Sequence, residues 1–445
     1  MKRMRMLFLL FCGAMAADLY LLESVDDLSA QEAARPEAPA PAIAEETSPA
    51  GLTGVTLDEL LGIALEQSPS IRAAWNAVQA KQSRILPNRT LPDPMFRFQT
   101  MGDLIPPTLQ EGDPSSARTF GIEQEIPFPG KLGLQGKMAG KEAEAELWSY
   151  EQVRREVVAE VKQAYYDYYL VHQAIETVRK DKDLLEKLAG IAGAKYSVGQ
   201  GIQQDVLKAQ VEVSKLIERA TVLEQQRALA AARINTLLAR PADSPLGRPA
   251  EVRKADFPFS LEQLQQLALG NDPGLKMRER EIERSRYGVE LARREFYPDF
   301  SVGFTYFNRE EMPEMYGLMA GVKVPLYFWR KQRPELEAAR AELAGAERSR
   351  ESTVLSLGLD LKDAYLMATT SQSLIDLYRS GVIPQARLSL ESAVAGYQVG
   401  KVDFLTLLDN LITLLEYELR YHEVVTDFQK ALARLEPLVG AELTK

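Results

Sequence analysis

The sequence has little of what most metal-binding and catalytic sites use. Its 445 residues include one cysteine and two histidines. The cysteine, Cys12, lies in the N-terminal segment, so the rest of the chain holds no disulfide and no thiolate metal site. His172 and His422 each lie in a long helical stretch without a second ligand at metal-site spacing. We therefore expect no metal centre and no cofactor.

Long apolar runs, basic charge and catalytic motifs are missing as well. Beyond the N-terminus, no run of about 20 apolar residues could form a membrane-spanning helix, so a membrane role would require β-strands. The net charge of -10 argues against binding to nucleic acid. The sequence has no G-x-S-x-G or H-E-x-x-H motif, and the glycine-rich segment 130–137 lacks phosphate-loop spacing. A secreted carbohydrate-active enzyme would need a cleft with paired acids, whereas the carboxylates here are spread along helix faces. We therefore expect that the protein is not an enzyme.

The N-terminal segment predicts export. Three basic residues precede a short apolar run, and Ala14-Met15-Ala16 fits the cleavage pattern of small residues. We predict a signal peptide at 1–16. Phe11 is large for the position before a lipoprotein cysteine, and the sequence leaves open whether Cys12 is lipidated. Residues 17–54 predict a disordered linker, because Ala, Pro, Glu and Ser dominate most of this segment.

The remaining sequence is an internal duplication with a period of about 200 residues. Short motifs recur in one order in both halves. The pairs are Thr56–Leu60 with Ser260–Leu264, Ala64–Pro69 with Ala268–Pro273, Pro92-Asp93 with Pro298-Asp299, Ile126-Pro127 with Val324-Pro325, Ala164-Tyr165 with Ala364-Tyr365, and Tyr196–Gly199 with Tyr397–Gly400. The period is too long for a solenoid. We predict two equivalent halves, 55–245 and 246–440, followed by a tail at 441–445.

Each half follows one plan. A first helix begins with a capping box, Thr56 with Glu59 in one half and Ser260 with Gln263 in the other. We expect a helical hairpin arm next, then two strands, then two long helices joined by a turn that contains glycine. The fold class is therefore mainly α with a small β part.

The strand segments alternate between apolar and polar residues. In 299–308, Phe300, Val302 and Phe304 share one face, and the segments 96–101, 120–126 and 318–324 follow a similar pattern. The strands run about 9–11 residues, which crosses a bilayer when tilted, and aromatic residues cluster at their ends. A soluble sheet packed on one side fits the alternation equally well. In lipid, four strands cannot close a barrel alone, so three copies would have to share one of twelve strands.

The long helices carry a coiled-coil repeat. Apolar residues recur in 136–194 at alternating spacings of four and three, and the positions shifted by about 200 stay largely apolar. The seam consists of Val157, Val161, Ala164, Tyr168, Val171, Ile175 and Val178. A second long helix follows in each half, at about 204–239 and 403–435, and Pro384 predicts a kink or offset. A soluble periplasmic coiled-coil scaffold is the alternative interpretation.

This combination resembles the TolC-like family of outer-membrane efflux channels over nearly all of residues 55–440. Two helix-turn-helix tips carry the resemblance most specifically. The first is Tyr196-Ser197-Val198-Gly199 followed by Asp205, and the second is Tyr397-Gln398-Val399-Gly400 followed by Asp403. The second tip is three residues shorter between its glycine and its aspartate. The segment Pro127–Leu132 also looks like members that serve heavy-metal exporters.

The resemblance implies a passive channel subunit in the outer membrane of a Gram-negative bacterium, with a long periplasmic extension. Duplicated antiparallel coiled-coil helices would form a periplasmic α-barrel. A homotrimer would share a 12-stranded β-barrel in outer-membrane lipid. Its partners would be a periplasmic adaptor (membrane fusion) protein and an inner-membrane pump of the RND type. The cargo would be metal ions or small organic solutes, and the sequence slightly favours metals.

The two tips are the candidate channel gate. Gly199 and Gly400 suit left-handed helix ends. Asp205 and Asp403 fall at the starts of the returning helices, where carboxylates are favoured, and helix capping alone explains each of them. In a threefold ring they would also attract cations, and mutual repulsion would raise their pKa values.

Three further residues belong to the predicted gate. Under the resemblance, Tyr196 and Tyr397 would brace the closed tip. Family members often carry an arginine at the second tip, where this chain has Lys401 nearby. The latch is therefore expected to differ in detail from that of other members.

Overall fold

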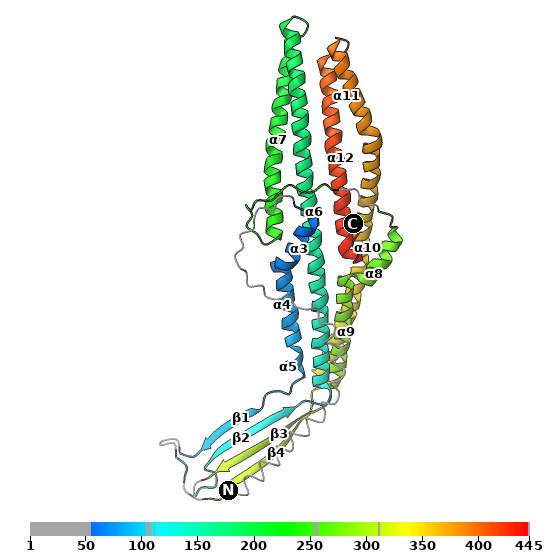
Figure 1. Ribbon diagram of the computed structural model, residues 1–445. Helices are drawn as coiled ribbons and strands as arrows, with labels where there is room; N and C mark the ends of the chain where they lie inside the picture. Colours follow the sequence, from blue (N-terminus) through cyan, green and yellow to red (C-terminus); the bar gives the residue numbers. More distant parts are fainter. Residues whose placement is uncertain (1–54, 104–107, 111, 253–256, 310–311, 444–445) are drawn as a thin grey trace. The chain divides into compact units, whose positions relative to one another are not determined.

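The computed structural model describes residues 55–103, 108–110, 112–252, 257–309 and 312–443. The predicted signal peptide at 1–16, the linker at 17–54, Cys12 and the last two residues of the tail lie outside this part of the chain. The described residues form long helices and one four-stranded sheet (Figure 1). None of their helices has both the length and the hydropathy that crossing a membrane requires.

The elements follow the same order in both halves. The first half contains α3 (Leu57–Gln67), α4 (Pro69–Ser83), α5 (Ile85–Arg89), β1 (Met95–Met101), β2 (Ala117–Ile126), α6 (Lys131–Ser197) and α7 (Gln203–Leu237). The second half contains α8 (Leu261–Asn271), α9 (Pro273–Arg294), β3 (Asp299–Asn308), β4 (Met315–Lys323), α10 (Gln332–Leu377), the π-helix η2 (Tyr378–Val382), α11 (Ile383–Gln398) and α12 (Phe404–Val439).

Both predicted capping boxes are confirmed. The Thr56 hydroxyl accepts a hydrogen bond from the Glu59 amide, and the Glu59 carboxylate accepts one from the Thr56 amide. Ser260 and Gln263 make the same reciprocal pair at the start of α8. Local sequence therefore fixes where the first helix of each half begins.

The predicted helical hairpin arm is wrong. Between the first helix and the strands, the second half has the single helix α9. In the first half, only Arg84, which has α-helical backbone angles, separates α4 from the short helix α5. Instead, α3 and α4 both pack on α6, whereas α8 packs on α10 and α12. The short helices therefore cover the long ones.

The long helices form a row in the order α7, α6, α12 and α10 (Figure 1). The predicted coiled-coil seam is confirmed, because all of its positions in α6 except Val171 are buried. Its counterparts in α10 are buried as well. One hydrophobic cluster joins α6, α7, α11 and α12, so the two halves share a core. The row has two free edges, formed by α7 and by α10 with α11.

The π-helix explains an irregularity in the repeat. Ala164 and Ala364 are 200 residues apart, whereas Tyr196 and Tyr397 are 201 apart. The additional residue is absorbed at η2, where a wider turn accommodates it. Pro384 follows directly and has no amide hydrogen with which to continue the α-helical ladder. The offset predicted at Pro384 is therefore confirmed.

The sheet is antiparallel throughout, in the order β1-β2-β3-β4. Its register places apolar residues next to one another across all four strands and polar or small residues in the neighbouring row. The apolar row is Phe96, Ile122, Phe304 and Leu318, and the next is Arg97, Gly121, Thr305 and Gly317. The predicted two-faced strands are confirmed, although β1 has 7 residues and is shorter than expected.

The turn into α6 is bound to the start of β3. Lys131 is buried, and its ammonium donates to Asp299 Oδ1 at 2.8 Å and to Glu295 Oε2 at 3.0 Å. The Phe128 amide also donates to Asp299 Oδ1, at 2.8 Å. Gly130 has φ 90°, which favours glycine, and a side chain there would collide with Arg294. These contacts connect the β2–α6 turn to the α9–β3 link.

Candidate functional site: the sheet and the helical tips

The sheet presents its apolar face to the surroundings. Phe96 is 76% exposed and Leu318 is 80% exposed, although both lie in the apolar row. Among the described residues, β1 pairs only with β2 and β4 pairs only with β3, so each edge strand has an open side. An exposed apolar face and open edges require a partner or a lipid environment.

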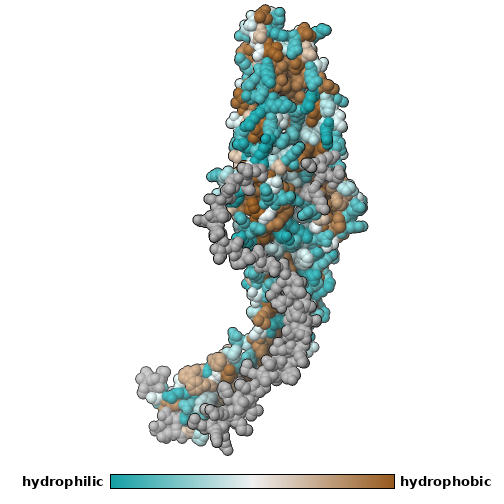
Figure 2. Space-filling model, in the orientation of Figure 1, coloured by the Kyte–Doolittle hydropathy of each residue, from teal (hydrophilic) through white to brown (hydrophobic). Residues whose placement is uncertain are grey.

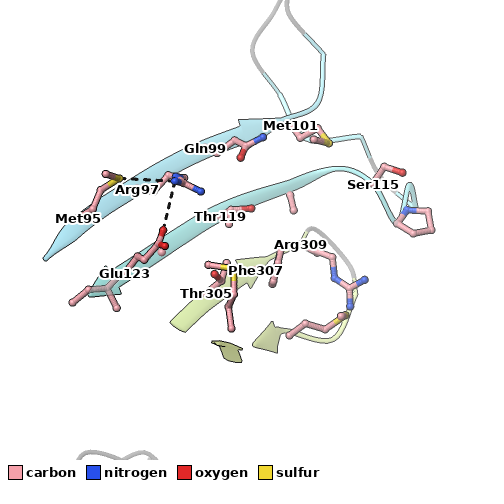
Figure 3. Close-up of a pocket in the computed structure, with 16 residues that line it drawn as sticks. Met95, Arg97, Gln99, Met101, Ser115, Thr119, Glu123, Thr305, Phe307 and Arg309 are labelled. Atoms are coloured by element: carbon pink, nitrogen blue, oxygen red, sulfur yellow. Dashed lines mark hydrogen bonds and ion pairs between the residues drawn. The ribbon is translucent and has the colours of Figure 1, made fainter. Parts of the chain in front are cut away.

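The opposite face carries the charged side chains of the sheet and is hollowed (Figure 3). A cavity of about 460 Å³ lies over it and is lined by polar residues such as Arg97, Gln99, Thr119 and Glu123, together with four methionines and Phe307. Arg97 Nη2 lies 3.8 Å from Glu123 Oε2 on the neighbouring strand. Charged pairs of this kind suit contact with water. One sheet therefore has one face fit for lipid and one fit for an aqueous lumen.

The two helical tips end in the predicted left-handed glycines. Gly199 has φ 76° and Gly400 has φ 73°. The Gln200 amide donates to the Lys195 carbonyl at 2.8 Å, and the Lys401 amide donates to the Gly396 carbonyl at 2.9 Å. Both turns are therefore Schellman-type helix ends, which only glycine adopts without strain.

The two tip aspartates differ. Asp403 caps α12, because its Oδ1 accepts from the Thr406 amide at 2.9 Å. Hydrogen bonds from the Thr406 side chain and from its amide lower the pKa of Asp403. Asp205 lies in the first turn of α7 but the N-cap is Ile202. Burial raises the pKa of Asp205, and the Asp403 carboxylate adds to the effect. Within one chain, repulsion between the two carboxylates therefore acts on Asp205, whereas hydrogen bonding dominates at Asp403. The rise expected for a threefold ring of carboxylates stays a prediction.

The two tip tyrosines also differ. Tyr397 is buried, and its ring meets that of Phe404 edge-on at 5.5 Å between centroids. Burial and the nearby Asp205 carboxylate raise the pKa of Tyr397. Tyr196 is exposed instead, as is Lys401. The structure therefore brings Tyr397, Asp205 and Asp403 within electrostatic reach, whereas Tyr196 and Lys401 lie at the surface.

Sequence reasoning missed Lys195. Its ammonium lies 4.2 Å from the centroid of the Tyr397 ring and donates a hydrogen bond to the Tyr397 carbonyl. The residue directly precedes the repeated Tyr196–Gly199 motif, and its counterpart in the second half is Gly396. Because the repeat does not preserve this residue, the duplicated motifs carry no signal for it.

Comparison with known proteins connects the sheet and the tips to a family. The family model described as outer membrane efflux protein matches residues 60–240 and 264–441. The chain belongs to the outer membrane efflux protein family. The first matched segment falls within the first predicted half, and the second ends one residue past the second predicted half.

Individual relatives agree with this assignment. The cobalt-zinc-cadmium resistance protein CzcC of Cupriavidus metallidurans is 22% identical over 396 residues, covering 87% of this chain and 90% of CzcC. The crystal structure of VceC from Vibrio cholerae has a TM-score of 0.75 at 16% identity, covering 87% of this chain and 96% of VceC. That of CusC also has a TM-score of 0.75 at 16% identity, covering 91% and 97%.

Membership explains both sites together. An outer membrane efflux protein is a channel of the outer membrane with a periplasmic extension, and it is a passive conduit rather than an enzyme. The two-faced sheet and the long helical hairpins are the two structural parts of this efflux protein.

Proposed function

We propose that three copies of this chain form a passive duct across the outer membrane that continues as a helical tunnel in the periplasm. Each copy would give its four strands to one twelve-stranded barrel. The observation that carries this proposal is the sheet, whose apolar face is exposed and whose edge strands are open. In lipid, only a closed barrel leaves no backbone group of a sheet unpaired. The polar face would line the lumen.

The internal repeat supports contacts between copies. On α6, the face toward α12 is used within the chain: the Arg155 guanidinium donates to the Pro437 carbonyl at 3.2 Å, and Lys162 Nζ lies 2.5 Å from Glu436 Oε2. Tyr166 on the same face is buried. The first long helix of the first half, α6, is therefore covered by the second long helix of the second half, α12.

The equivalent face of α10 is uncovered. The counterparts of Arg155, Lys162 and Tyr166 are two leucines and Lys362, all of them exposed, and a third exposed leucine lies one turn after the first. Each leucine is more than half exposed. The three leucines are Leu355, Leu359 and Leu366. By the repeat, their natural cover is α7, the first-half counterpart of α12, which lies at the other edge of the helix row. The α7 helix of a second copy would fit there, and repetition of this head-to-tail contact closes a ring.

The tips suit a periplasmic adaptor. Val198, Ile202 and Val399 are exposed around the two turns, and Figure 2 shows apolar side chains gathered near this end of the hairpins. Exposed apolar residues at one end of a structure are typical of a protein-binding surface. Because a passive duct has no energy source of its own, we assign the driving force to an inner-membrane pump of the RND type.

The cargo we propose is metal ions. The support is the relative CzcC, whose name assigns it to cobalt, zinc and cadmium resistance. The test is growth of a strain that lacks the gene, with and without a plasmid copy. We expect the deletion to sensitise cells to zinc, cobalt or cadmium. Sensitivity to dyes or antibiotics alone would instead assign small organic solutes.

We further propose that the gate comprises Tyr397, Asp205 and Asp403 together with the turns at Gly199 and Gly400. Tyr196 and Lys401, at the tip surface, would contact the adaptor. Neutralising both carboxylates in an Asp205→Asn/Asp403→Asn variant should loosen the tip and weaken its preference for cations, since a ring of carboxylates attracts cations.

Single-channel recording in planar bilayers tests the gate. We expect higher conductance and lower cation selectivity for the variant than for the wild type. A matched control is Asp183→Asn/Glu391→Gln, which removes two exposed carboxylates farther from the turns. Equal conductance and selectivity in wild type and the tip variant would reject the gate. If the chain left cells with the soluble periplasmic proteins, the scaffold interpretation would replace the channel.

A further inference from the structure

Lys195 connects the two helical hairpins of one chain at their tips. It lies in the last turn of α6, and its ammonium reaches Tyr397 at the end of α11. The ammonium donates a hydrogen bond to the Tyr397 carbonyl and lies 4.2 Å from the centroid of its ring. One side chain thus makes two contacts with a single residue of the other hairpin.

Both contacts have a clear physical basis. The Tyr397 carbonyl belongs to the last turn of α11, where the helix dipole is negative, and it accepts a hydrogen bond from the Gly400 amide at 3.2 Å. Its second lone pair is available to Lys195. A lysine from a neighbouring element therefore caps this helix end. The ring of Tyr397 faces the ammonium as a cation–π partner. Tyr397 also packs against Phe404 at the start of α12. Through Tyr397, Lys195 therefore holds the turn between α11 and α12 in place.

Only the first hairpin of each chain carries the lysine that makes this contact. The counterpart of Lys195 in the second half is Gly396, and that of Tyr397 is Tyr196. A side chain at Gly396 would begin 2.5 Å from Val402 Cγ2, so the close packing of the second turn excludes a lysine there. Tyr196 is 47% exposed within the chain. The second hairpin therefore has no equivalent side chain to offer to the first hairpin of a neighbouring copy.

We propose that Lys195 is the positioning residue that holds the two tips of each copy together in the closed channel, and that seams between copies lack this tether. The inference rests on the proposed trimeric duct. In a ring of three copies, three seams within chains would be tethered and three seams between chains would not. Tip opening would then begin at the seams between copies.

Recording of single channels in planar bilayers tests the tether with the purified full-length protein. Lys195→Met removes the charge and the donor, and we expect at least about a tenfold rise in the ratio of open to closed time, because loss of a charged hydrogen bond alone has about that effect and the cation–π contact is lost as well. Lys195→Arg retains both contacts and should stay close to the wild type. Lys195→Gln keeps a donor without the charge and should fall between them.

Lys187→Met is the matched control, because Lys187 is exposed on the same helix two turns earlier. It should behave as the wild type. The tether is rejected if assembled Lys195→Met channels open no more often than the wild type, or if the control opens as often as they do. Should Lys195→Met not assemble, Lys195→Gln decides by the same comparison. A wild type that forms no channels at all would instead refute the proposed function.

Discussion

Asp181 is a buried carboxylate in surroundings that do not suit a charge. It lies on α6 within the core shared by the two hairpins and is 2% exposed. Its Oδ2 atom has no hydrogen-bond partner among the described residues. On α12, Glu418 faces it and is itself held by Arg387 and Lys180, at 2.8 and 3.6 Å. Burial, with repulsion from Glu418, raises the pKa of Asp181 to about 6.

This shift predicts a pH dependence of stability. The folded chain binds the Asp181 proton more tightly than the unfolded chain, whose reference pKa is 3.8. The stabilisation from the proton is therefore complete below pH 3.8 and is lost as the pH rises through about 6. At pH 7 the ionised carboxylate destabilises the fold by about 3 kcal/mol. Asp181→Asn should raise the thermal midpoint at pH 7–8 and flatten its dependence on pH between 5 and 8.

Circular dichroism melts of the detergent-solubilised protein measure this effect. Asp183→Asn, an exposed neighbour on the same helix, is the control and should leave the profile unchanged. A lower midpoint for Asp181→Asn than for the wild type at pH 8 would show that the carboxylate is stabilising, contrary to expectation.

Sequence predicted residues whose role is local and missed those whose role depends on distant contacts. Gly199 and Gly400 were predictable because a left-handed helix end calls for glycine whatever surrounds it. Lys195 was not, because its two contacts are with a residue 202 positions away. The predicted capping role is confirmed for Asp403. The same prediction is wrong for Asp205, because the first tip has a longer loop and places Ile202 at the cap of α7.

At the scale of elements, the π-helix η2 makes a sharp prediction. Upstream, the buried seam of α10 runs to Ile375, and downstream it continues at Leu390, Ala393 and Tyr397. Removing one residue between Ile375 and Leu390 would bring Leu390, Ala393 and Tyr397 into the upstream seam's register, in which buried residues alternate at spacings of four and three. Deletion of Gly381 should therefore convert η2 to ordinary α-helix and preserve the fold, with a thermal midpoint within about 5 °C of the wild type.

Deletion of Gly358 in α10 is the control, since no π-turn exists there to absorb the change. It should rotate the downstream seam by about 100° and abolish assembly. Circular dichroism and size-exclusion chromatography distinguish the two variants. Loss of assembly after deletion of Gly381 would mean that the wide turn is required for more than register.

The strands and long helices were predictable because their apolar repeats persist over many residues, with a period of 2 residues in the strands and 3.5 residues in the helices. The path of the short helices was not. The link at Ser68 allows several directions, and α4 follows α6 because α6 offers it a surface to pack on. A sequence pattern records which face of a helix is apolar, whereas the partner of that face is decided by the assembled core.

At the scale of the whole molecule, the exposed leucines of α10 predict the strength of assembly. Replacing Leu359 and Leu366 by serine should weaken the contact with a neighbouring copy, because each buried leucine contributes about 1.5–3 kcal/mol. We expect multi-angle light scattering in detergent to find trimers for the wild type and mostly monomers for the variant. Leu269→Ser, at an exposed leucine on α8, is the control. An intact trimer in the double variant would remove α10 from the interface.

The tandem duplication has a further consequence for how such a ring can evolve. A ring of six identical single repeats would receive every mutation six times, so all of its joints would change together. In the proposed ring, one gene encodes two unlike repeats, and a difference such as that between Lys195 and Gly396 would reach only alternate contacts between hairpins. Selection could therefore stabilise the contacts within each chain and leave the contacts between chains weak. A ring of identical single repeats could not evolve this difference.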